Sequence, residues 1–242
     1  MLRSVIPAVL AVALTACGGG GSGGSSVTPG GDSTPVADPT ILDTTPKLGA
    51  LLQTNHTSMV PAKFKADQTP FLVVGHYRFI TGGTETGPIK VYQLNSDGTI
   101  QDATVEILGG AVSASTNIPL IADFNHDGID DVFLPGFSDT QDLVPSIAFI
   151  SRPGRSHIRV DLPDPVYSHT ATVVDVNNDG HLDVMDSWGQ TWINDGTGSF
   201  RFRSHDYNSA PGFWIHGSGI CAGDFNNSGR KQIVLTDQML DA

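Results

Sequence analysis

Cysteines and basic residues are scarce in this sequence, and each shortage rules out a class of protein. Two cysteines, Cys17 and Cys221, occur in 242 residues, too few for a disulfide framework or a cysteine-rich metal site. There are 13 Lys and Arg residues against 25 Asp and Glu residues, so the formal net charge is −12. Such an acidic chain lacks the basic footprint that nucleic acid or an anionic membrane surface requires.

Familiar catalytic motifs are also missing. None of the eight histidines belongs to a His-Glu-x-x-His zinc motif. Gly217-Ser218-Gly219 lacks the Gly-x-Ser-x-Gly spacing of a hydrolase nucleophile elbow. The sequence therefore contains no catalytic constellation, which makes an enzyme the less favoured class.

The first residues have the features of an export signal. Met1–Ser4 is positively charged, and the apolar run Val5–Leu14 is too short to span a bilayer. The next residues, Thr-Ala-Cys17, resemble the processing box of bacterial lipoproteins. The resemblance implies removal of residues 1–16, a lipid on Cys17 that holds the protein to the membrane and, because Gly18 follows, a place in the outer membrane or at the cell surface. An ordinary signal peptide with an incidental cysteine is the alternative.

The remaining chain divides by composition into three parts. Residues 17–40 are rich in Gly and Ser, which predicts a flexible tether with a reach of roughly 25 Å. Residues 41–64 form an N-terminal segment without a clear pattern. Residues 65–242 carry regular strand signals and form the predicted main domain.

One pattern of oxygen-bearing side chains recurs along this domain. It begins at Asp123 as Asp-Phe-Asn-His-Asp-Gly-Ile-Asp-Asp and returns 52 residues later at Asp175 as Asp-Val-Asn-Asn-Asp-Gly-His-Leu-Asp. It starts again at Asp224 as Asp-Phe-Asn-Asn-Ser-Gly. We call these segments loops 1, 2 and 3 and number their positions from the first Asp. A period near 50 residues indicates a repeat architecture.

The chemistry of the pattern suits a hard cation. Oxygens at positions one, three, five and nine, with the backbone carbonyl of position seven, can wrap an ion such as calcium, which takes six to eight oxygen ligands. Glycine at position six lets the backbone reverse without a Cβ clash. Without a cation, each close pair of carboxylates repels by about 4 kcal/mol at the effective dielectric constant of a protein surface.

Short strands flank the loops. The strand signals cover residues 71–74, 89–94, 104–108, 118–122, 131–134, 147–150, 157–160, 171–174, 183–185, 190–193, 199–202, 219–224 and 233–235. Asn95-Ser-Asp-Gly98 and Asn194-Asp-Gly-Thr-Gly198 supply turn residues. Each repeat therefore contains a strand, a loop, two strands, a turn and a strand. This order predicts an all-β fold, specifically a β-propeller of four-stranded blades.

Residues 122–128, 192–200 and 222–226 resemble the FG-GAP/VCBS repeats of integrin-type β-propellers. The resemblance covers residues 65–242 and implies an ion in the hairpin between the first two strands of a blade. The calcium ligands that it implies are Asp123, Asn125, Asp127, the Ile129 carbonyl and Asp131 in loop 1, and Asp175, Asn177, Asp179, the His181 carbonyl and Asp183 in loop 2. Loop 3 keeps Asp224 and Asn226 but has Ser228 at position five and Gln232 at position nine, which predicts weak or no calcium binding.

Two other interpretations of the loops remain. An EF-hand needs a bidentate Glu at position twelve, where loop 1 has Leu134 and loop 2 has Asp186. Dockerin-type loops accept Asp there, but they are helical and closely spaced. The second alternative is a metal-free turn in which Asp and Asn side chains satisfy backbone donors.

These observations predict a lipid-anchored, calcium-stabilised β-propeller that serves as a cell-surface interaction or adhesion module. A protein or a carbohydrate is expected to bind on its face, and Trp188, Trp192 and Trp214 are expected to pack between blades. The alternative is the N-terminal part of a longer exported enzyme that acts on polysaccharide. Roughly three and a half blades fit in the chain, so we expect either that the ring continues beyond Ala242 or that a segment such as 41–60 closes it.

Overall fold

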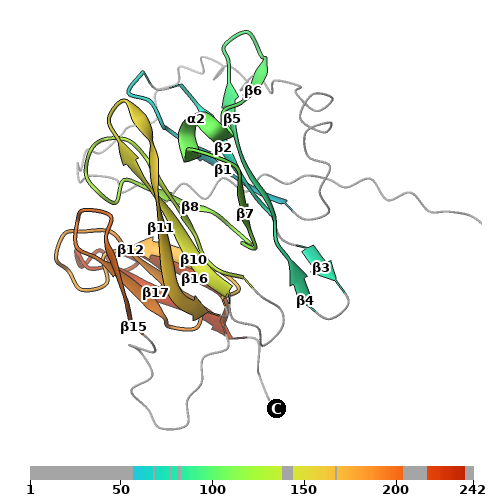
Figure 1. Cartoon of the computed structure of the whole chain (residues 1–242). Coiled ribbons are helices and arrows are strands. Elements are labelled where there is room, and N and C mark those ends of the chain that lie inside the picture. The colour runs from blue at the N-terminus through green and yellow to red at the C-terminus, as the bar shows by residue number, and fades with distance from the viewer. Residues whose placement is uncertain are drawn as a thin grey trace, which may run out of the picture. The chain divides into compact units, whose positions relative to one another are not determined.

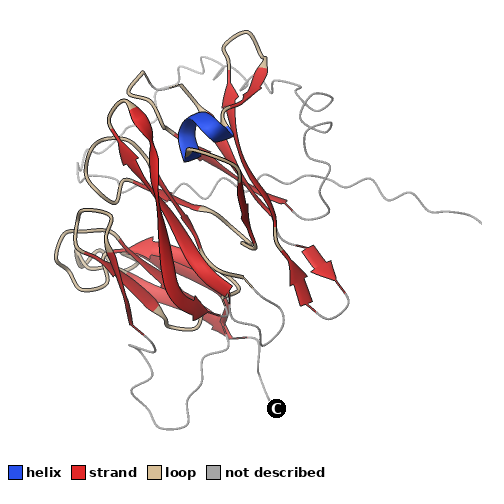
Figure 2. Cartoon of the chain, in the orientation of Figure 1, coloured by secondary structure: helices blue, strands red, loops and turns tan. Residues whose placement is uncertain are grey.

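Strands make up nearly all the regular structure of the described residues (Figure 2). The computed structural model describes residues 57–67, 69–76, 78–80, 83–137, 144–166, 168–203 and 217–237. The predicted signal and tether, including Cys17, lie outside the described residues, as does Trp214. The prediction of an all-β fold is confirmed.

The first sheet contains five strands. They are β1 (Thr57–Ala62), β2 (Phe71–His76), β5 (Gly87–Leu94), β6 (Ile100–Asp102) and β7 (Val112–Ala114). The order is β1-β2-β5-β6, and β7 pairs with the beginning of β5. A separate hairpin joins β3 (Arg78–Ile80) to β4 (Gly83–Glu85).

The segment Thr104–Leu108, predicted as a strand, is the short helix α2. That prediction is wrong because local capping and packing favour a helical turn here. The Asp102 carboxylate accepts a hydrogen bond from the Thr104 amide at 2.9 Å, and Gly109 ends the helix with a left-handed φ of 77°. The turn buries the adjacent residues Ile107 and Leu108 in the same core, whereas a strand would point them to opposite faces.

The second and third repeats each form a four-stranded antiparallel meander, as predicted. One contains β8 (Leu120–Ala122), β9 (Asp131–Leu134), β10 (Val144–Arg152) and β11 (Arg155–Val166). The other contains β12 (Ala171–Val174), β13 (Asp183–Asp186), β14 (Thr191–Asn194) and β15 (Phe200–Arg203). The bounds of β9 and β12 are those that the sequence predicts.

The second sheet has a hydrophobic core on each of its faces, because successive side chains of a strand point to opposite sides. In β9, Val132 and Leu134 pack in one core with residues of the first sheet. Phe133 lies in the other core, where its ring is 5.4 Å from that of Trp192 in β14. Trp192 is fully buried, which confirms that it packs between repeats. The first three sheets therefore pack against one another in chain order.

The fourth repeat contributes β16 (Gly217–Gly223) and β17 (Gln232–Asp237), which pair as a two-stranded sheet and are drawn in red in Figure 1. β16 contacts β12 of the third sheet. In the described part of the chain, β1 pairs with β2 and does not extend the β16–β17 sheet, and no sheet closes on itself. Residues 57–60 therefore do not complete the last sheet. No described helix has the length and apolar character needed to cross a membrane.

Candidate metal-binding loops

Each loop joins the first two strands of its repeat. Loop 1 connects β8 to β9, loop 2 connects β12 to β13, and loop 3 connects β16 to β17. The first residue of the second strand is position nine in every case. The structure thus places the three loops in equivalent hairpins.

The first Asp of each loop holds the turn closed. Asp123 accepts hydrogen bonds from the amides of Asp127 and Gly128 at 3.1 and 2.9 Å. Asp175 accepts the equivalent bonds from Asp179 and Gly180 at 3.2 and 3.0 Å. Positions four and six have positive φ in all three loops. These repeated bonds give loops 1 and 2 the same backbone path.

Positions three and five add further bonds within the loops. In loop 1, Asn125 Oδ1 accepts from the Asp127 amide at 3.2 Å, and Asp127 Oδ1 accepts from the Ile129 amide at 2.9 Å. In loop 2, the corresponding acceptors are Asn177 and Asp179, with distances of 3.0 and 2.9 Å. The side-chain oxygens of positions one, three and five are therefore turned inward along each loop.

Position nine is a buried carboxylate in loops 1 and 2. Asp131 and Asp183 have no exposed surface. Burial raises the pKa of Asp131 to about 6, against the opposing effect of its hydrogen bonds. Burial also raises the pKa of Asp183, and the nearby carboxylates Asp179 and Asp175 add to this rise. Burial therefore disfavours the charged form of both carboxylates, a cost that a bound cation would offset.

Each position-nine carboxylate joins its loop to the third strand of the same repeat, which is β10 for Asp131 and β14 for Asp183. Asp131 accepts from the amides of Phe124 and Ser151, both at 2.7 Å. Asp183 accepts from Val176 at 2.9 Å and from Asn194 at 2.8 Å. Sequence reasoning missed Ser151 and Asn194 as partners, because they lie 20 and 11 residues away and no motif marks this role.

Ser151 also contacts the two middle positions of loop 1. Its hydroxyl donates to Asp127 Oδ2 at 2.8 Å, and its carbonyl accepts from the Asn125 side-chain amide at 3.1 Å. Loop 1 is further held by Lys63, whose amide donates to the Asp130 carboxylate at 2.7 Å. Strand β10 and the end of β1 therefore fix loop 1 from two sides.

The donor set of loops 1 and 2 fits a calcium ion. Each loop offers three carboxylates, one amide oxygen and one backbone carbonyl, all of them hard oxygen ligands. Among the described residues, none of these carboxylates is ion-paired with Lys or Arg. In the same part of the chain, no three Asp, Glu, His or Cys side chains are gathered closely enough to form a ready-made metal cluster. The hydrogen-bonded side-chain oxygens of these loops keep lone pairs for a cation. Cation binding would therefore bring these oxygens closer together around the ion.

Loop 3 departs from the other two. Asp224 makes the same closing bonds, to the amides of Ser228 and Gly229 at 2.9 and 2.7 Å. Position nine is Gln232, whose side-chain oxygen accepts from the Phe225 amide at 2.7 Å. Loop 3 thus keeps the backbone shape of the others with one carboxylate in place of three.

The two histidines of loops 1 and 2 face each other. His126 Nε2 and His181 Nδ1 are 3.1 Å apart and share a hydrogen bond. Both side chains lie outside the predicted ligand set, since His126 is at position four and His181, at position seven, contributes only its carbonyl. They form a contact between the second and third repeats.

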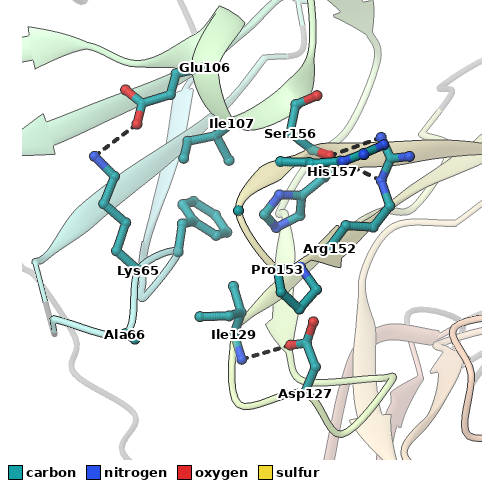
Figure 3. A pocket seen from close by; sticks show the side chains of 13 residues that line it. Lys65, Ala66, Glu106, Ile107, Asp127, Ile129, Arg152, Pro153, Ser156 and His157 are labelled. Carbon is teal, nitrogen blue, oxygen red and sulfur yellow. Dashed lines mark hydrogen bonds and ion pairs between the residues drawn. The ribbon is translucent and has the colours of Figure 1, made fainter.

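A pocket of about 600 Å³ opens beside loop 1 (Figure 3). Asp127 and Ile129 form part of its wall, as does the buried His157, whose Nε2 donates to the Asp130 carbonyl at 2.9 Å. An ion pair of 2.8 Å between Lys65 and Glu106 lies at its edge. Loop 1 thus contributes two residues to the wall of this pocket.

The Asp186 side chain, at position twelve of loop 2, is held in the turn that follows β13. Its Oδ1 accepts from the amides of Trp188 and Gln190 at 2.9 and 2.8 Å, within the turn that joins β13 to β14. Loop 2 is also flanked by strands and not by helices. Both observations favour a hairpin between two strands over an EF-hand or a dockerin-type loop.

Comparison with models of known protein families finds none that matches this chain, and no curated protein matches it either.

Proposed function

We propose that this protein is a calcium-stabilised β-propeller module of the FG-GAP/VCBS kind, held at the cell surface by a lipid on Cys17, where it serves in interaction or adhesion. The observation that supports this proposal is the equivalence of loops 1 and 2. Two segments 52 residues apart in sequence have the same closing bonds and the same buried carboxylate at position nine.

Calcium is structural in this proposal. The residues that would hold it are Asp123, Asn125, Asp127, Ile129 and Asp131 in loop 1, and Asp175, Asn177, Asp179, His181 and Asp183 in loop 2. When bound, the ion supplies positive charge that offsets the repulsion among the three carboxylates of a loop. The chain's own contribution is to aim these oxygens and to exclude water from position nine.

The loops are placed where their order affects more than one repeat. Loop 1 contacts β10 through Ser151 and the first repeat through Lys63, and loop 2 contacts loop 1 through the two histidines. Calcium in either loop would therefore stabilise neighbouring repeats as well as its own hairpin. This is the property expected of a scaffold that presents a ligand surface, here including the pocket beside loop 1.

The test is thermal unfolding of the purified chain with 10 mM CaCl₂ or with EDTA, by calorimetry at pH 7.5. Extracellular calcium modules commonly have Kd values of about 10⁻⁴ to 10⁻³ M, so each site would add about 1.4 kcal/mol or more under these conditions. We expect the Tm to fall by several degrees in EDTA. Asp127→Ala and Asp179→Ala should each remove about half of this difference.

Asp161→Ala is the matched control, because it removes an exposed carboxylate outside the loops. Its melting should respond to calcium as the wild type does. A wild-type Tm that is the same in calcium and in EDTA would refute the structural role of calcium. The alternative function is that of the N-terminal part of a longer polysaccharide-acting enzyme, and nothing in the described loops favours it.

A further inference from the structure

Gln232 takes over the structural task of the position-nine carboxylate in loop 3. Its Oε1 accepts from the Phe225 amide at 2.7 Å. The same bond joins Asp131 to the amide of position two in loop 1 at 2.7 Å, and Asp183 to that amide in loop 2 at 2.9 Å. The replacement of Asp by Gln therefore preserves the closure of the hairpin.

The other end of the same amide group makes contacts that an Asp cannot make. Gln232 Nε2 lies 3.0 Å from Asn226 Oδ1, 3.3 Å from Ser228 Oγ and 2.7 Å from the Arg230 carbonyl oxygen. These oxygens belong to positions three, five and seven. The same positions supply three of the five predicted calcium ligands in loops 1 and 2.

The orientation of the Gln232 amide follows from its neighbours. The Phe225 backbone N–H is a donor and requires the side-chain oxygen, which leaves the NH₂ group to face the three loop oxygens. The opposite orientation would set two donors against each other and place an oxygen against the Asn226 side-chain oxygen and the Arg230 carbonyl. The polar network is satisfied in one orientation.

Loop 3 also carries less negative charge than loops 1 and 2, which makes it less suited to a cation. Asp224 is its single acid among positions one, three, five and nine, where loops 1 and 2 each have three. A cation entering loop 3 would displace the amide donor and would gain mostly neutral oxygens. The residues of loop 3 thus do not fit calcium.

We propose that loop 3 is a metal-free copy of the calcium loop, in which the Gln232 side-chain nitrogen replaces the ion. Positions three, five and seven are joined by a group that is covalently part of the chain. The β16–β17 hairpin therefore keeps its shape without calcium, and calcium dependence is confined to loops 1 and 2. The contrast with those loops rests on the proposed function, whereas the role of Gln232 in loop 3 does not.

The test is amide hydrogen exchange of the full chain, measured by NMR in calcium and in EDTA. In the wild type, the amides of Phe225, Ser228 and Gly229 should exchange at the same rates in both buffers. Gln232→Glu keeps an oxygen for the Phe225 amide but replaces the NH₂ donor by an acceptor. We expect exchange about tenfold faster in EDTA for this variant, and recovery of protection in calcium. Gln101→Glu is the control, since it adds the same charge on exposed strand β6.

Gln232→Ala gives a second measurement that does not depend on any cation. It removes both the acceptor and the donor, so loop 3 amides should exchange faster in both buffers. Wild-type loop 3 amides that lose protection in EDTA, or a Gln232→Ala variant with unchanged exchange, would overturn the proposal. Failure of the proposed function has a different signature, because loop 1 and loop 2 amides would then be insensitive to EDTA while the loop 3 results still hold.

Discussion

The side-chain amide of Asn194 donates a hydrogen bond to the backbone carbonyl of Phe124, 70 residues earlier in the chain, at 2.8 Å. The same amide reaches the Leu182 carbonyl of loop 2 at 3.1 Å. Its oxygen accepts from the amides of Gly196 and Gly198 in the following turn. One buried side chain therefore connects loop 1, loop 2 and the β14–β15 turn.

Asn194→Ala should be strongly destabilising, because it leaves several buried backbone groups without partners. Each such group costs about 1 to 3 kcal/mol, and we expect the free energy of unfolding to fall by roughly 2 to 4 kcal/mol in urea denaturation. Asn95→Ala is the matched control. Asn95 occupies a similar turn, but within the described part of the chain its side chain bonds with Gln93 and Thr99 of its own hairpin and with no other repeat. Equal losses for the two variants would contradict the connecting role of Asn194.

The second and third repeats could be predicted from the sequence because loop and turn chemistry marks their strand ends. Loop 2 predicts where β12 ends and β13 begins, and the glycine-containing turn after Asn194 separates β14 from β15. The first repeat lacks such a loop, so nothing in the sequence signalled β1, and helix α2 was predicted as a strand. A segment of five residues with apolar members satisfies either pattern, and tertiary packing decides between them.

The sequence predicts where the loops of the candidate site lie, but not their contacts with other strands. The spacing of oxygen side chains identifies loops 1 and 2 and marks loop 3 as different. The roles of Ser151 and Asn194 depend on the register of antiparallel strands, which sequence spacing does not specify. The orientation of Gln232 likewise follows from its neighbours in space, so sequence reasoning recognised the lost acid but not the gained amide.

Gly198 is a position where the turn and the packing between repeats both require glycine. Its φ is 80°, and a Cβ added there would lie 2.7 Å from Cγ2 of Ile150 in the second sheet. We expect Gly198→Ala to lower the free energy of unfolding by roughly 2 to 4 kcal/mol, from backbone strain and overpacking together. Denaturation with urea measures this loss.

Gly189→Ala separates the effect of backbone strain from the effect of overpacking. Gly189 has nearly the same φ, 81°, but no atom lies within 4 Å of its added Cβ. In this variant, backbone strain alone should lower the free energy of unfolding, by about 1 to 2 kcal/mol. If both variants lose the same amount, the contact with Ile150 does not constrain the turn.

The lipid anchor is tested by metabolic labelling. Cells that express the chain should incorporate radiolabelled palmitate into the protein, because the predicted processing leaves Cys17 as the first residue. Cys17→Ser should abolish the label, and Cys221→Ser should not. Absence of label in the wild type would refute the anchor without bearing on the calcium loops.

The burial of the Asp186 carboxyl group should make the stability of the fold depend on pH. Its side chain is fully buried in the β13–β14 hairpin, and burial raises its pKa to about 7, against the effect of hydrogen bonds from Gln190, Trp188 and Gly189. The folded state therefore holds the proton more tightly than the unfolded state does. The stabilising contribution is complete below the ordinary pKa of about 4 and is lost as the pH rises toward 7.

Asp186→Asn removes this titration and keeps a side-chain oxygen for the amides of Trp188 and Gln190. The variant should gain stability relative to the wild type as the pH rises from 4 to 8, by as much as about 4 kcal/mol. Urea denaturation at pH 4, 6 and 8 in constant calcium measures this difference. Every other titrating group is common to both proteins, so the change in the difference isolates Asp186. A difference that does not vary with pH would show that the buried carboxylate ionises in the fold as readily as in the unfolded chain.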